Sequence, residues 1–574
     1  MSKIYYIRKN HRAGHPSNII FLDCETRGVE AGGVQLHKMY MGWTWRIDID
    51  VNAAVRSESW QYWNDRNLLA DYVTSHSKPR HPLHVIGSNI TFDLFASGLM
   101  EHLNADGWSC EVMYEKATTT ILVVTKDKRR IRFMALQNWL PGGVKEWGNL
   151  LGIDKLEVDF SEDEETIKRY CRRDVEITGR TFLSYLRFTL AHDMGRFRWT
   201  APGQALSCYR HRFLKDKSIL HYDVPSFNAF TRAGYYGGRV ECRQVGQLTD
   251  GPFVQLDVNS MYPAVMQNNL FPGKLVQWVK GCSIKRLEQS LENYCCMARV
   301  KVRTENPAYP KRVDGKLMFP VGEFTTYLCT ESLQYALSHH EILEVEHLAT
   351  FTRQELFTDW VDYFYPLKQK YQAERDGVWT ACVKLFLNSL YGKFGEQRER
   401  EIVSCESPRD EIWRRTVLVP QVYLDEPPEP FKPELERFES DPQHYVSGIE
   451  WSCLGTYQMT VKGDEGPMSA PAIAAHVTDY ARQLLWRYMQ EVGWKEVLYC
   501  DTDSLIIHER NLPRLEAQLD AKRLGALKVE GVAEALSLRA PKDYTFGTKL
   551  RRKGIRADAK QVGESSFAQA RFPG

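Results

Sequence analysis

The sequence predicts a multidomain protein that combines α/β and α+β architecture. Its 574 residues correspond to about three to four domains at roughly 150 residues each. Hydrophobic residues make up 43% and charged residues 26%, which is the balance of a chain with several packed cores. The first third alternates strand and helix patterns. A disordered or fibrous protein is excluded.

Composition also indicates the cellular environment and the kinds of partner that the chain can have. The mean hydropathy is −0.43, no apolar run reaches 18 residues, and the first 15 residues lack a secretory signal. The 13 cysteines are odd in number and form no Cys-x-x-Cys pair, which favours reduced intracellular thiols. The net charge is only +2, so any nucleic-acid surface must come from local clustering of cations.

Strands and helices follow from the patterns in order. Apolar runs predict strands at 17–26 and 84–89, and paired strands at 121–127 and 130–136. A long helix follows through 194, with Ser161 and Glu164 as a capping box at its start. A loop-like zone from Thr200 to Gln204 predicts a boundary near residue 195.

The second half contains one buried strand, two helices and a hairpin. The strand runs from 253 and ends at Pro263, and the helices span 357–372 and 379–394 with a turn near Gly377. The segment 423–442 is rich in proline and acid, which predicts a surface insertion or linker. Residues 496–507 predict two short strands around a tight turn.

Three carboxylates lie at the ends of apolar strands in this half. Asp257 ends one run, and Asp501 and Asp503 occupy the hairpin turn. Such carboxylates repel one another and lose hydration unless a cation binds them. Mg²⁺ prefers a few carboxylates together with substrate phosphates, and a pair of ions can activate a hydroxyl and stabilise leaving pyrophosphate. The alternative is ordinary turn chemistry, which also favours Asp-x-Asp.

The helix 379–394 carries two stripes. Lys384, Asn388 and Tyr391 lie on one face, and an adjoining apolar stripe is formed by Val383, Leu387, Leu390 and Phe394. A cation, an amide and a ring suit a nucleoside triphosphate, and Lys368 on the preceding helix can add a second phosphate contact. The alternative is a solvated amphipathic helix, which explains the lysines but not Asn388 and Tyr391.

A second set of carboxylates lies near the N-terminus. Asp23 and Glu25 follow one predicted strand, Asp93 follows another, and Tyr170 and Asp174 share a helix face at i and i+4. Four carboxylates from three elements can hold two metals, with Tyr170 orienting a water nucleophile. Each motif taken alone is more typical of a structural role, since Asp-x-Glu is common.

The motifs DVNSMYP, KLFLNSLYGKFG and YCDTDS resemble motifs A, B and C of family B DNA polymerases, in the same order. The resemblance implies a right-hand polymerase domain with palm, fingers and thumb. It implies that Asp257 and Asp503, with Val258, bind two Mg²⁺ or Mn²⁺ ions and that Asp501 is a less direct partner. Tyr262 would lie beneath the incoming sugar and exclude a 2′-hydroxyl, and Tyr391 would form the other wall.

The N-terminal set resembles the Exo I, II and III motifs of the family's 3′–5′ proofreading domain, which has a ribonuclease-H-like fold. The resemblance implies two further ions on Asp23, Glu25, Asp93 and Asp174 and an active exonuclease. Lys155 matches a lysine that assists this exonuclease. Within the Exo I and II motifs, the residues expected to hold the DNA strand are Thr26, Asn89 and Phe92.

The chain resembles most closely the protein-primed branch found in small tailed bacteriophages. Its length matches that branch, and Exo I begins at residue 23, which leaves no room for an extra N-terminal domain. The segment 235–238 resembles the branch's YxGG/A linker, 478–482 its Tx₂AR motif, and 542–544 its KxY motif. The DNA contacts implied are Tyr235, Gly237, Gly238, Gly392, Lys393, Arg482, Lys542 and Tyr544, joined by Lys549 and Lys553 in a basic run that extends to Arg556.

These motifs give a domain plan. We expect an exonuclease domain over 1–195 and a polymerase domain over 196–574. Within the latter, we expect palm at about 196–300 and 460–535, a first insertion at about 300–360, fingers at about 361–396, a second insertion at about 397–465, and a thumb at about 536–574. The first insertion would contact a priming protein. Only 18 residues follow Arg556, so either the thumb is small or the chain is cut short.

Two features depart from the branch. The interval from Phe394 to Tyr499 is longer than expected for the second insertion, which puts strand displacement in doubt. Trp139 lies where the branch commonly has a serine or threonine that holds single-stranded DNA, and both base stacking and core packing fit a tryptophan there.

We therefore expect a monomeric, template-directed DNA polymerase with proofreading, acting on primer-template DNA and dNTPs, with a terminal protein as primer. Its expected location is the cytoplasm of a bacterial host. Alternatives are a family B polymerase that extends ordinary primers, a DNA-binding scaffold that has lost synthesis, and a nuclease that uses only the N-terminal site. None of these expectations includes a membrane.

Overall fold

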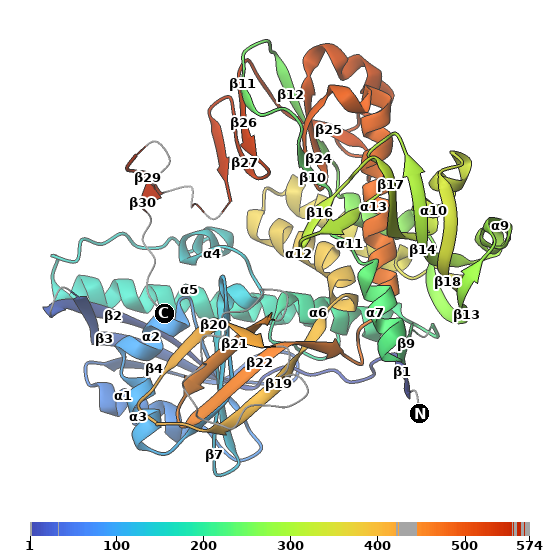
Figure 1. Cartoon of the computed structure of the whole chain (residues 1–574). Helices are drawn as coiled ribbons and strands as arrows, with labels where there is room; N and C mark the ends of the chain where they lie inside the picture. The colour runs from blue at the N-terminus through green and yellow to red at the C-terminus, as the bar shows by residue number, and fades with distance from the viewer. Residues whose placement is uncertain are drawn as a thin grey trace.

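A computed structural model describes residues 3–31, 34–217, 219–420, 423, 445–553, 555, 559–563 and 567–568. Figure 1 shows an N-terminal half built on one large sheet beneath a long helix, and a second half made of several smaller sheets and paired helices. Within the described ranges, no helix has the length and apolar character needed to cross a membrane. The buried apolar residues form one large core that extends through both halves, together with smaller cores.

The N-terminal sheet has seven strands in the order β4-β3-β2-β5-β8-β7-β6. The central strands β2, β5 and β8 are parallel, and both flanks are antiparallel. The strand bounds are β2 Asn18–Ala31, β3 Val34–Ile49, β4 Val55–Trp63, β5 Leu83–Gly87, β6 Ser109–Lys116, β7 Thr119–Lys126 and β8 Arg129–Ala135. The strands predicted at 17–26 and 84–89 and the paired strands at 121–127 and 130–136 are confirmed.

Helices cover both faces of this sheet. Phe21 and Trp45 pack against α5 (Glu164–Ala191), which crosses one face, while Ile20 and Leu22 pack against the helices on the other face. Those helices are α1 Arg66–Ser75, α2 Ile90–Ala96 and α3 Leu99–Ala105, and α4 Val144–Leu151 precedes α5. Alternation along β2 therefore fills two cores.

The start of α5 differs from the prediction. Its N-cap is Asp163, whose carboxylate accepts a hydrogen bond from the Thr166 backbone N–H at 3.0 Å, rather than Ser161. The Ser161–Glu164 capping box is therefore wrong. Aspartate caps a helix as well as serine does, and Asp163 directly precedes the first helical residue.

The linker after α5 contains α6 Ala201–Cys208, a π-helical turn Tyr209–Phe213, β9 Ile219–Asp223 and α7 Pro225–Ala233. β9 pairs with β1 Lys3–Ile7, so the amino end of the chain is joined to the linker. Thr200 caps α6 with its hydroxyl. The loop-like zone predicted at 200–204 is thus the first turn of a helix.

The central sheet of the second half is antiparallel, in the order β10-β23-β24-β12-β25. Its strands are β10 Val240–Cys242, β12 Phe253–Val258, β23 Val497–Asp501, β24 Ser504–His508 and β25 Leu527–Ala533. The helices α8 Met261–Asn268 and α13 Pro471–Val492 pack together behind it. The hairpin predicted at 496–507 is confirmed. The strand predicted to reach Pro263 ends at Val258 instead, since a proline fits the first turn of α8.

Two antiparallel helices stand beside this sheet, α11 Thr358–Ala373 and α12 Gly377–Phe394. They confirm the predicted helix pair and its turn, in which Asp376 caps α12 by accepting from the Trp379 N–H at 2.9 Å. The predicted apolar stripe of α12 is buried, and it packs against α6, α8 and α13. This packing fixes which face of α12 looks toward the central sheet.

A four-stranded sheet, in the order β13-β18-β14-β17, precedes the helix pair. Its elements are β13 Phe271–Cys282, α9 Ile284–Asn293, β14 Cys295–Thr304, β17 Gly322–Cys329, α10 Thr330–Ser338 and β18 Ile342–Gln354, with a small hairpin of β15 Lys311–Val313 and β16 Lys316–Met318. The boundary expected near 300 falls inside β14. Because β13 pairs along β18, the unit begins at Phe271.

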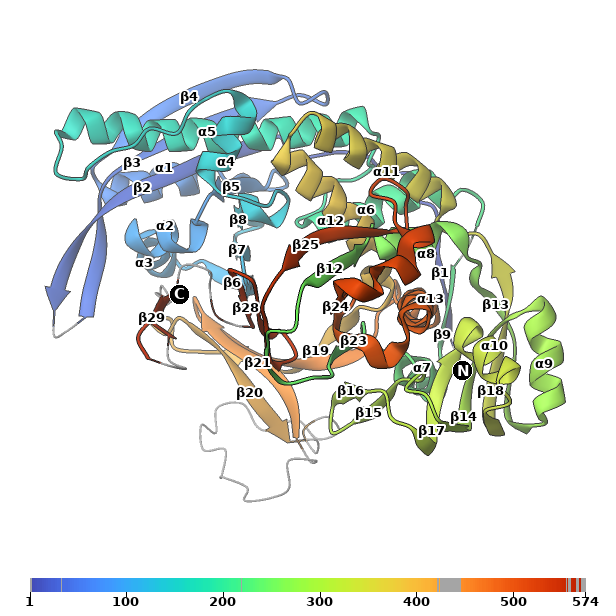
Figure 2. The ribbon, with the colours of Figure 1, turned by 90° about the horizontal axis from the view of Figure 1, so that it is seen from above.

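A second four-stranded sheet joins the two halves of the molecule. Its strands are β19 Gln397–Glu406, β20 Trp413–Pro420, β21 Tyr445–Cys453 and β22 Thr456–Glu465. Trp451 and Cys453 enter the core beneath α3, and Arg409 donates to the backbone carbonyl of Asn104 at 3.2 Å. Figure 2 shows this sheet beside β6 of the N-terminal half. The predicted insertion 423–442 lies outside the described residues apart from Tyr423.

The chain ends in a small sheet of order β11-β26-β27-β28. Its strands are β11 Gly246–Leu248, β26 Leu536–Ala540, β27 Asp543–Phe546 and β28 Lys549–Arg552, and β29 Lys560–Gln561 pairs with β30 Phe567–Ala568 beyond it. The described residues also contain three-residue 3₁₀ turns at Leu136–Asn138 and Trp494–Glu496 and a longer one at Glu509–Gln518.

Candidate active sites

The three carboxylates of the second half meet at one end of the central sheet. Asp257 is the penultimate residue of β12 and is paired in register with Ser504, next to Asp503. The Val258 N–H donates to the Asp503 carbonyl at 2.7 Å, which ties the two chain segments together. Burial raises the pKa of Asp503 to about 6, and the charge of Asp257 adds to the shift. The environment of Asp503 thus disfavours its charged form.

Two lysines partly neutralise these carboxylates. Lys528 Nζ lies 3.2 Å from the Asp257 carboxylate, and Lys542 Nζ lies 3.2 Å from that of Asp501. Lys542 was among the residues predicted from sequence, but Lys528 was not. No local pattern marks Lys528, because it reaches Asp257 only through the pairing of β25 with β12.

Two tyrosine rings form one wall beside the carboxylates. The Tyr262 ring on α8 stacks on the Tyr391 ring on α12, with 4.6 Å between ring centroids and 25° between planes. The two predicted walls of a nucleotide pocket are therefore in direct contact. Asn388 lies half-buried one turn before Tyr391 on α12.

Two further lysines face the same region. Lys368 is 6% exposed and donates to the Ser260 hydroxyl at 2.8 Å, while Lys384 is exposed. Burial lowers the pKa of Lys368 to about 8, and the positive charge of Lys384 contributes. The positive charge of Lys528 acts on the Lys368 ammonium in the same direction. An anion bound between Lys368 and Lys384 would relieve the repulsion.

The segment 235–238 packs against two of the polymerase-like motifs. A Cβ on Gly395 would overlap the Tyr235 ring, and one on Gly238 would lie 2.8 Å from the Thr502 side chain. Gly237 and Gly392 face open space. Two of the four glycines thus permit close internal packing, and the other two leave room beside the backbone.

Arg482 does not have the exposure that was predicted for a DNA contact. It is 4% exposed, and its guanidinium donates to the carbonyls of Tyr236 and Gly237 at 3.0 Å and to Asp479 at 3.2 Å. The prediction that Arg482 touches DNA directly is wrong. Because α13 is buried on nearly every side, this side chain holds the 235–238 segment from below.

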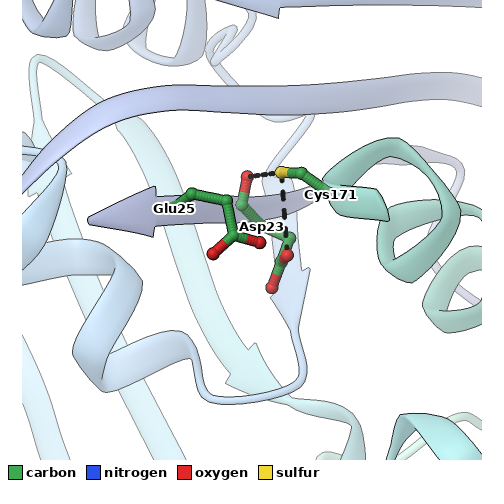
Figure 3. Close-up of side chains that lie close together, drawn as sticks. All are labelled: Asp23, Glu25 and Cys171. Atoms are coloured by element: carbon green, nitrogen blue, oxygen red, sulfur yellow. Dashed lines mark hydrogen bonds between the residues drawn. The ribbon is translucent and has the colours of Figure 1, made fainter. Parts of the chain in front are cut away.

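The N-terminal carboxylates also gather, at the middle of β2. Asp23 and Glu25 project from this strand, and Cys171 of α5 approaches them from the side (Figure 3). The Cys171 thiol lies 3.4 Å from the Asp23 carbonyl and 3.7 Å from its carboxylate. Burial raises the pKa of Asp23 well above its usual range, with help from Asp93 and Asp174, and burial raises that of Glu25 to about 7. Sequence reasoning missed Cys171.

Asp93 and Asp174 complete this set. Asp93 accepts hydrogen bonds from the Cys24 backbone N–H and thiol at 3.3 Å each. Burial raises its pKa to about 7, and its other carboxylate oxygen is buried without a hydrogen-bond partner among the described residues. Asp174 is paired with Lys155 at 2.5 Å, and the Lys155 ammonium lies 4.8 Å from the Tyr170 ring centroid.

The remaining predicted contacts differ in exposure. Asn89, Lys549 and Lys553 are exposed, and Thr26 Oγ1 lies 3.0 Å from His37 Nδ1. The Phe92 ring meets the His37 ring edge-on, and Lys393 pairs with Glu396. Gly554 and Arg556 of the basic run lie outside the described residues.

Two aromatic residues are buried. The Tyr544 ring is 7% exposed and packs on Tyr499 with 4.9 Å between centroids, so the predicted DNA contact by this ring is wrong. Trp139 is fully buried and donates to the Arg198 carbonyl at 2.7 Å. Of the two roles considered for Trp139, core packing is therefore confirmed.

The donor atoms suit hard divalent cations. In the N-terminal cluster, ligand atoms within 4.8 Å of one another come from the carboxylates of Asp23 and Glu25 and from the thiol of Cys171, and Asp93 has a buried oxygen without a partner in the described part of the chain. Mg²⁺ and Mn²⁺ prefer such oxygen ligands. Burial is the main cause of the raised carboxylate pKa values, and repulsion between the carboxylates adds to it, so a bound cation would stabilise their charged forms. The residues present therefore fit the ions that the sequence predicted.

The comparisons with known proteins agree with this geometry. A family model described as "DNA polymerase type B, organellar and viral" matches residues 154–425. A probable DNA polymerase of Neurospora intermedia is 23% identical over 60% of this chain and 33% of its own length, and the DNA-directed DNA polymerase of Enterobacteria phage PRD1 is 23% identical over 68% and 63%. The matched part of this chain therefore spans between one third and just under two thirds of the length of these relatives.

Solved structures share the whole fold. The phi29 DNA polymerase, complexed with primer-template DNA and incoming nucleotides, superposes with a TM-score of 0.66 over 94% of this chain and 93% of that chain, at 15% identity. Its orthorhombic crystal form gives a TM-score of 0.63. The predicted fold, an exonuclease domain followed by a right-hand polymerase domain, is confirmed.

Proposed function

Because a family model of organellar and viral type B DNA polymerases matches residues 154–425 and the fold resembles that of phi29 DNA polymerase, we propose that this chain is a family B DNA polymerase that extends DNA primers on a template and removes nucleotides from their 3′ ends. The observation that carries the proposal is the meeting of Asp257, Asp501 and Asp503 with the stacked pair Tyr262–Tyr391 at one end of the central sheet. A carboxylate cluster beside a ring wall suits nucleotidyl transfer.

In the polymerase site each group has a separate task. Lys368 and Lys384 bind the triphosphate, and the Ser260 contact holds the Lys368 ammonium in place. The stacked ring of Tyr262 supports the sugar and leaves no space for a 2′-hydroxyl, while Asn388 and Tyr391 complete the wall. Lys542 holds Asp501. Arg482, beneath the 235–238 segment, positions that segment for the template.

The N-terminal site would hydrolyse the terminal phosphodiester. Tyr170 orients the attacking water, and Lys155 orients Asp174 through their ion pair. Thr26, Asn89 and Phe92 hold the strand end. Divalent ions would activate the primer hydroxyl or this water and would neutralise the leaving group, and their proposed ligands are Asp257, Val258 and Asp503 in one site and Asp23, Glu25, Asp93 and Asp174 in the other.

Gel resolution of a 5′-labelled primer on a longer template tests both activities. With Mg²⁺ we expect lengthening when dNTPs are present and shortening when they are absent. Asp503→Asn should abolish lengthening and spare shortening, and Asp23→Asn should do the reverse. Shortening by the native protein in both lanes would instead favour a nuclease, and binding without either reaction would favour a scaffold. Chelation of divalent ions should stop both reactions.

We further propose that a priming protein starts synthesis, as in the protein-primed branch. The support is the sheet at Phe271–Gln354, which lies between α8 and α11 where that branch carries the insertion that contacts its terminal protein. A covalent protein–nucleotide product, formed only when a candidate priming protein is added, would support this mode. Efficient extension of ordinary primers without such a product would support the conventional alternative. Action inside a bacterial host is part of the same proposal.

A further inference from the structure

A strongly basic pocket lies away from both carboxylate clusters. Its volume is about 680 Å³, and we call it the arginine pocket after the four arginines that line it, Arg80, Arg132, Arg196 and Arg198. Three histidines and the ring of Trp199 add to the lining, and no carboxylate does. In a chain whose net charge is only +2, this is a local concentration of positive charge.

The four arginines lack ion-pair partners within the described part of the chain. Among the described residues, none of them forms an ion pair with a carboxylate. Arg132 instead lies 5.1 Å from the Trp199 ring and donates to His84 Nε2 at 3.0 Å. Burial, together with neighbouring arginines, lowers the pKa of Arg132 and of Arg198. A cluster of this kind is stabilised when an anion binds.

The positive surface continues into a second cavity. This cavity, of about 460 Å³, shares Arg80 and Pro82 with the arginine pocket. It is lined by Lys78, Lys128, Arg129 and Arg130, with Glu111 as its one carboxylate. Glu111 is engaged by Arg130 at 2.7 Å. Two cavities that meet at Arg80 form a basic track, which suits an extended chain of phosphates better than one free nucleotide.

The track is separate from the exonuclease carboxylates. Arg80, His81 and His84 lie at the beginning of β5, whereas Asp93 lies beyond its end. Helix α5 connects the two regions. Asp174, in its first half, belongs to the exonuclease carboxylates, and its last residue, Ala191, lies five residues before Arg196 of the arginine pocket. At 1.5 Å per residue, the stretch between Asp174 and Ala191 spans about 25 Å. Figure 1 shows α5 running the length of the N-terminal half. A strand in the track therefore does not occupy the hydrolytic site.

We infer that the arginine pocket binds the phosphates of a single-stranded segment of the DNA substrate, outside both active sites. The guanidinium groups suit bidentate contacts to phosphate, and Trp199 offers a ring for a base. The contacts fall on the sugar–phosphate chain, so binding does not depend on sequence. The inference rests on the proposed function in that the substrate is taken to be DNA.

Binding of primer-template DNA with different overhangs tests the inference. The native protein should bind a 5′ template overhang of about 20 nucleotides more tightly than one of about 4 nucleotides, a length at the lower end of single-strand site sizes. The double variant Arg80→Gln/Arg196→Gln should lose about 10-fold affinity for the long overhang only, with a shallower salt dependence. Both side chains are exposed, so the fold should tolerate the change.

The matched control removes two cations elsewhere, a half-buried lysine and an exposed arginine. Lys301→Gln/Arg303→Gln alters β14, where both side chains pair with Glu323, and should leave the overhang effect intact. If the double variant melts at a lower temperature than the native protein, the single variant Arg80→Gln gives the same test. A variant that binds every single-stranded substrate as tightly as the native protein would overturn the inference.

Two further binding experiments identify which ligand supplies the phosphates that the arginine pocket binds. A long flap on the non-template strand replaces the template overhang in one arm, and free dATP competes with the labelled DNA in another. Loss of affinity for either type of single strand supports the inference, whereas loss of dATP binding alone overturns it. Primer extension on the short overhang is measured in parallel. If neither protein extends the primer, the proposed function fails, while the binding result still decides the role of the pocket.

Discussion

The Tyr262 and Tyr391 rings stack at 4.6 Å between centroids, although the two residues lie on different helices and far apart in the chain. Tyr262 is on α8, directly after the strand that ends near Asp257, and Tyr391 is on α12. Stacked aromatic pairs add about 0.5–1.5 kcal/mol beyond the burial of their surfaces. This pair therefore connects the helix pair α11–α12 to the carboxylates of the central sheet.

Loss of the Tyr262 ring should weaken discrimination against ribonucleotides. In Tyr262→Ala, space opens beneath the sugar, and we expect the ratio of kcat/KM for dNTP over rNTP to fall by about 10- to 100-fold, the effect of a few kcal/mol of lost steric exclusion. Single-nucleotide incorporation with each substrate measures the ratio. Tyr262→Phe keeps the ring and is the control. An unchanged ratio in Tyr262→Ala would place the sugar elsewhere.

Removal of the Lys542 ammonium should slow synthesis and spare hydrolysis. In Lys542→Ala, Asp501 loses its partner at 3.2 Å, and we expect kcat/KM for extension to fall by about 10-fold. Steady-state extension and exonuclease assays measure the two activities. Lys301→Ala removes a comparably exposed lysine paired with Glu323 and should change neither. Equal loss of both activities in Lys542→Ala would indicate a general defect of folding.

A methyl group on Gly238 should disturb the Asp501–Asp503 turn. The new Cβ would lie 2.8–3.1 Å from three atoms of the Thr502 side chain, so the turn must shift. We expect Gly238→Ala to reduce extension about 10-fold and to lower the free energy of unfolding by about 1–3 kcal/mol. Urea unfolding measures the latter. Gly237→Ala, where a Cβ meets open space, should change the stability by less than about 0.5 kcal/mol. Equal stabilities of the two variants would contradict the close packing.

The buried His84 should make stability depend on pH. Burial lowers its pKa to about 3, with a further contribution from Arg132, whereas the unfolded chain has the ordinary value near 6.5. Below pH 6.5 the unfolded state therefore binds one more proton, so stability falls as the pH falls. Between pH 7.5 and 5 the loss from this residue is about 2 kcal/mol.

His84→Gln removes the imidazole that takes up the extra proton in the unfolded state. The glutamine keeps a hydrogen-bond acceptor for Arg132. We expect the variant to lose about 2 kcal/mol less than the native protein between the two pH values, as measured by urea unfolding. His102→Gln, at a half-buried histidine near Asp71, serves as the comparison. If His84→Gln shows the same pH dependence as the native protein, His84 is protonated in the folded state.

The sequence predicted the local elements where one signal was dominant. Two short apolar runs around a tight turn identified the hairpin at Asp501 and Asp503, and helical spacing identified the buried stripe of α12. The sequence misplaced the end of an element where two nearby residues are equally good helix caps. At the start of α5, Ser161 was predicted as the cap, but Asp163 is the cap. The strand expected to reach Pro263 failed for a related reason, since proline both ends strands and begins helices.

By itself, the sequence predicted the kind of chemistry that we propose for this protein. The prediction came from short motifs that contain carboxylates, lysines and tyrosines in a fixed order. Side chains of these types at those spacings suit the binding of metal ions and nucleotides. The tertiary structure alone decided which polar residues reach the surface. Arg482 and Tyr544 belong to apparent DNA-contact motifs but are buried, while Lys528 and the arginine pocket have no local pattern. Contacts between distant segments depend on strand pairing and packing, and these bring together residues that the sequence keeps far apart.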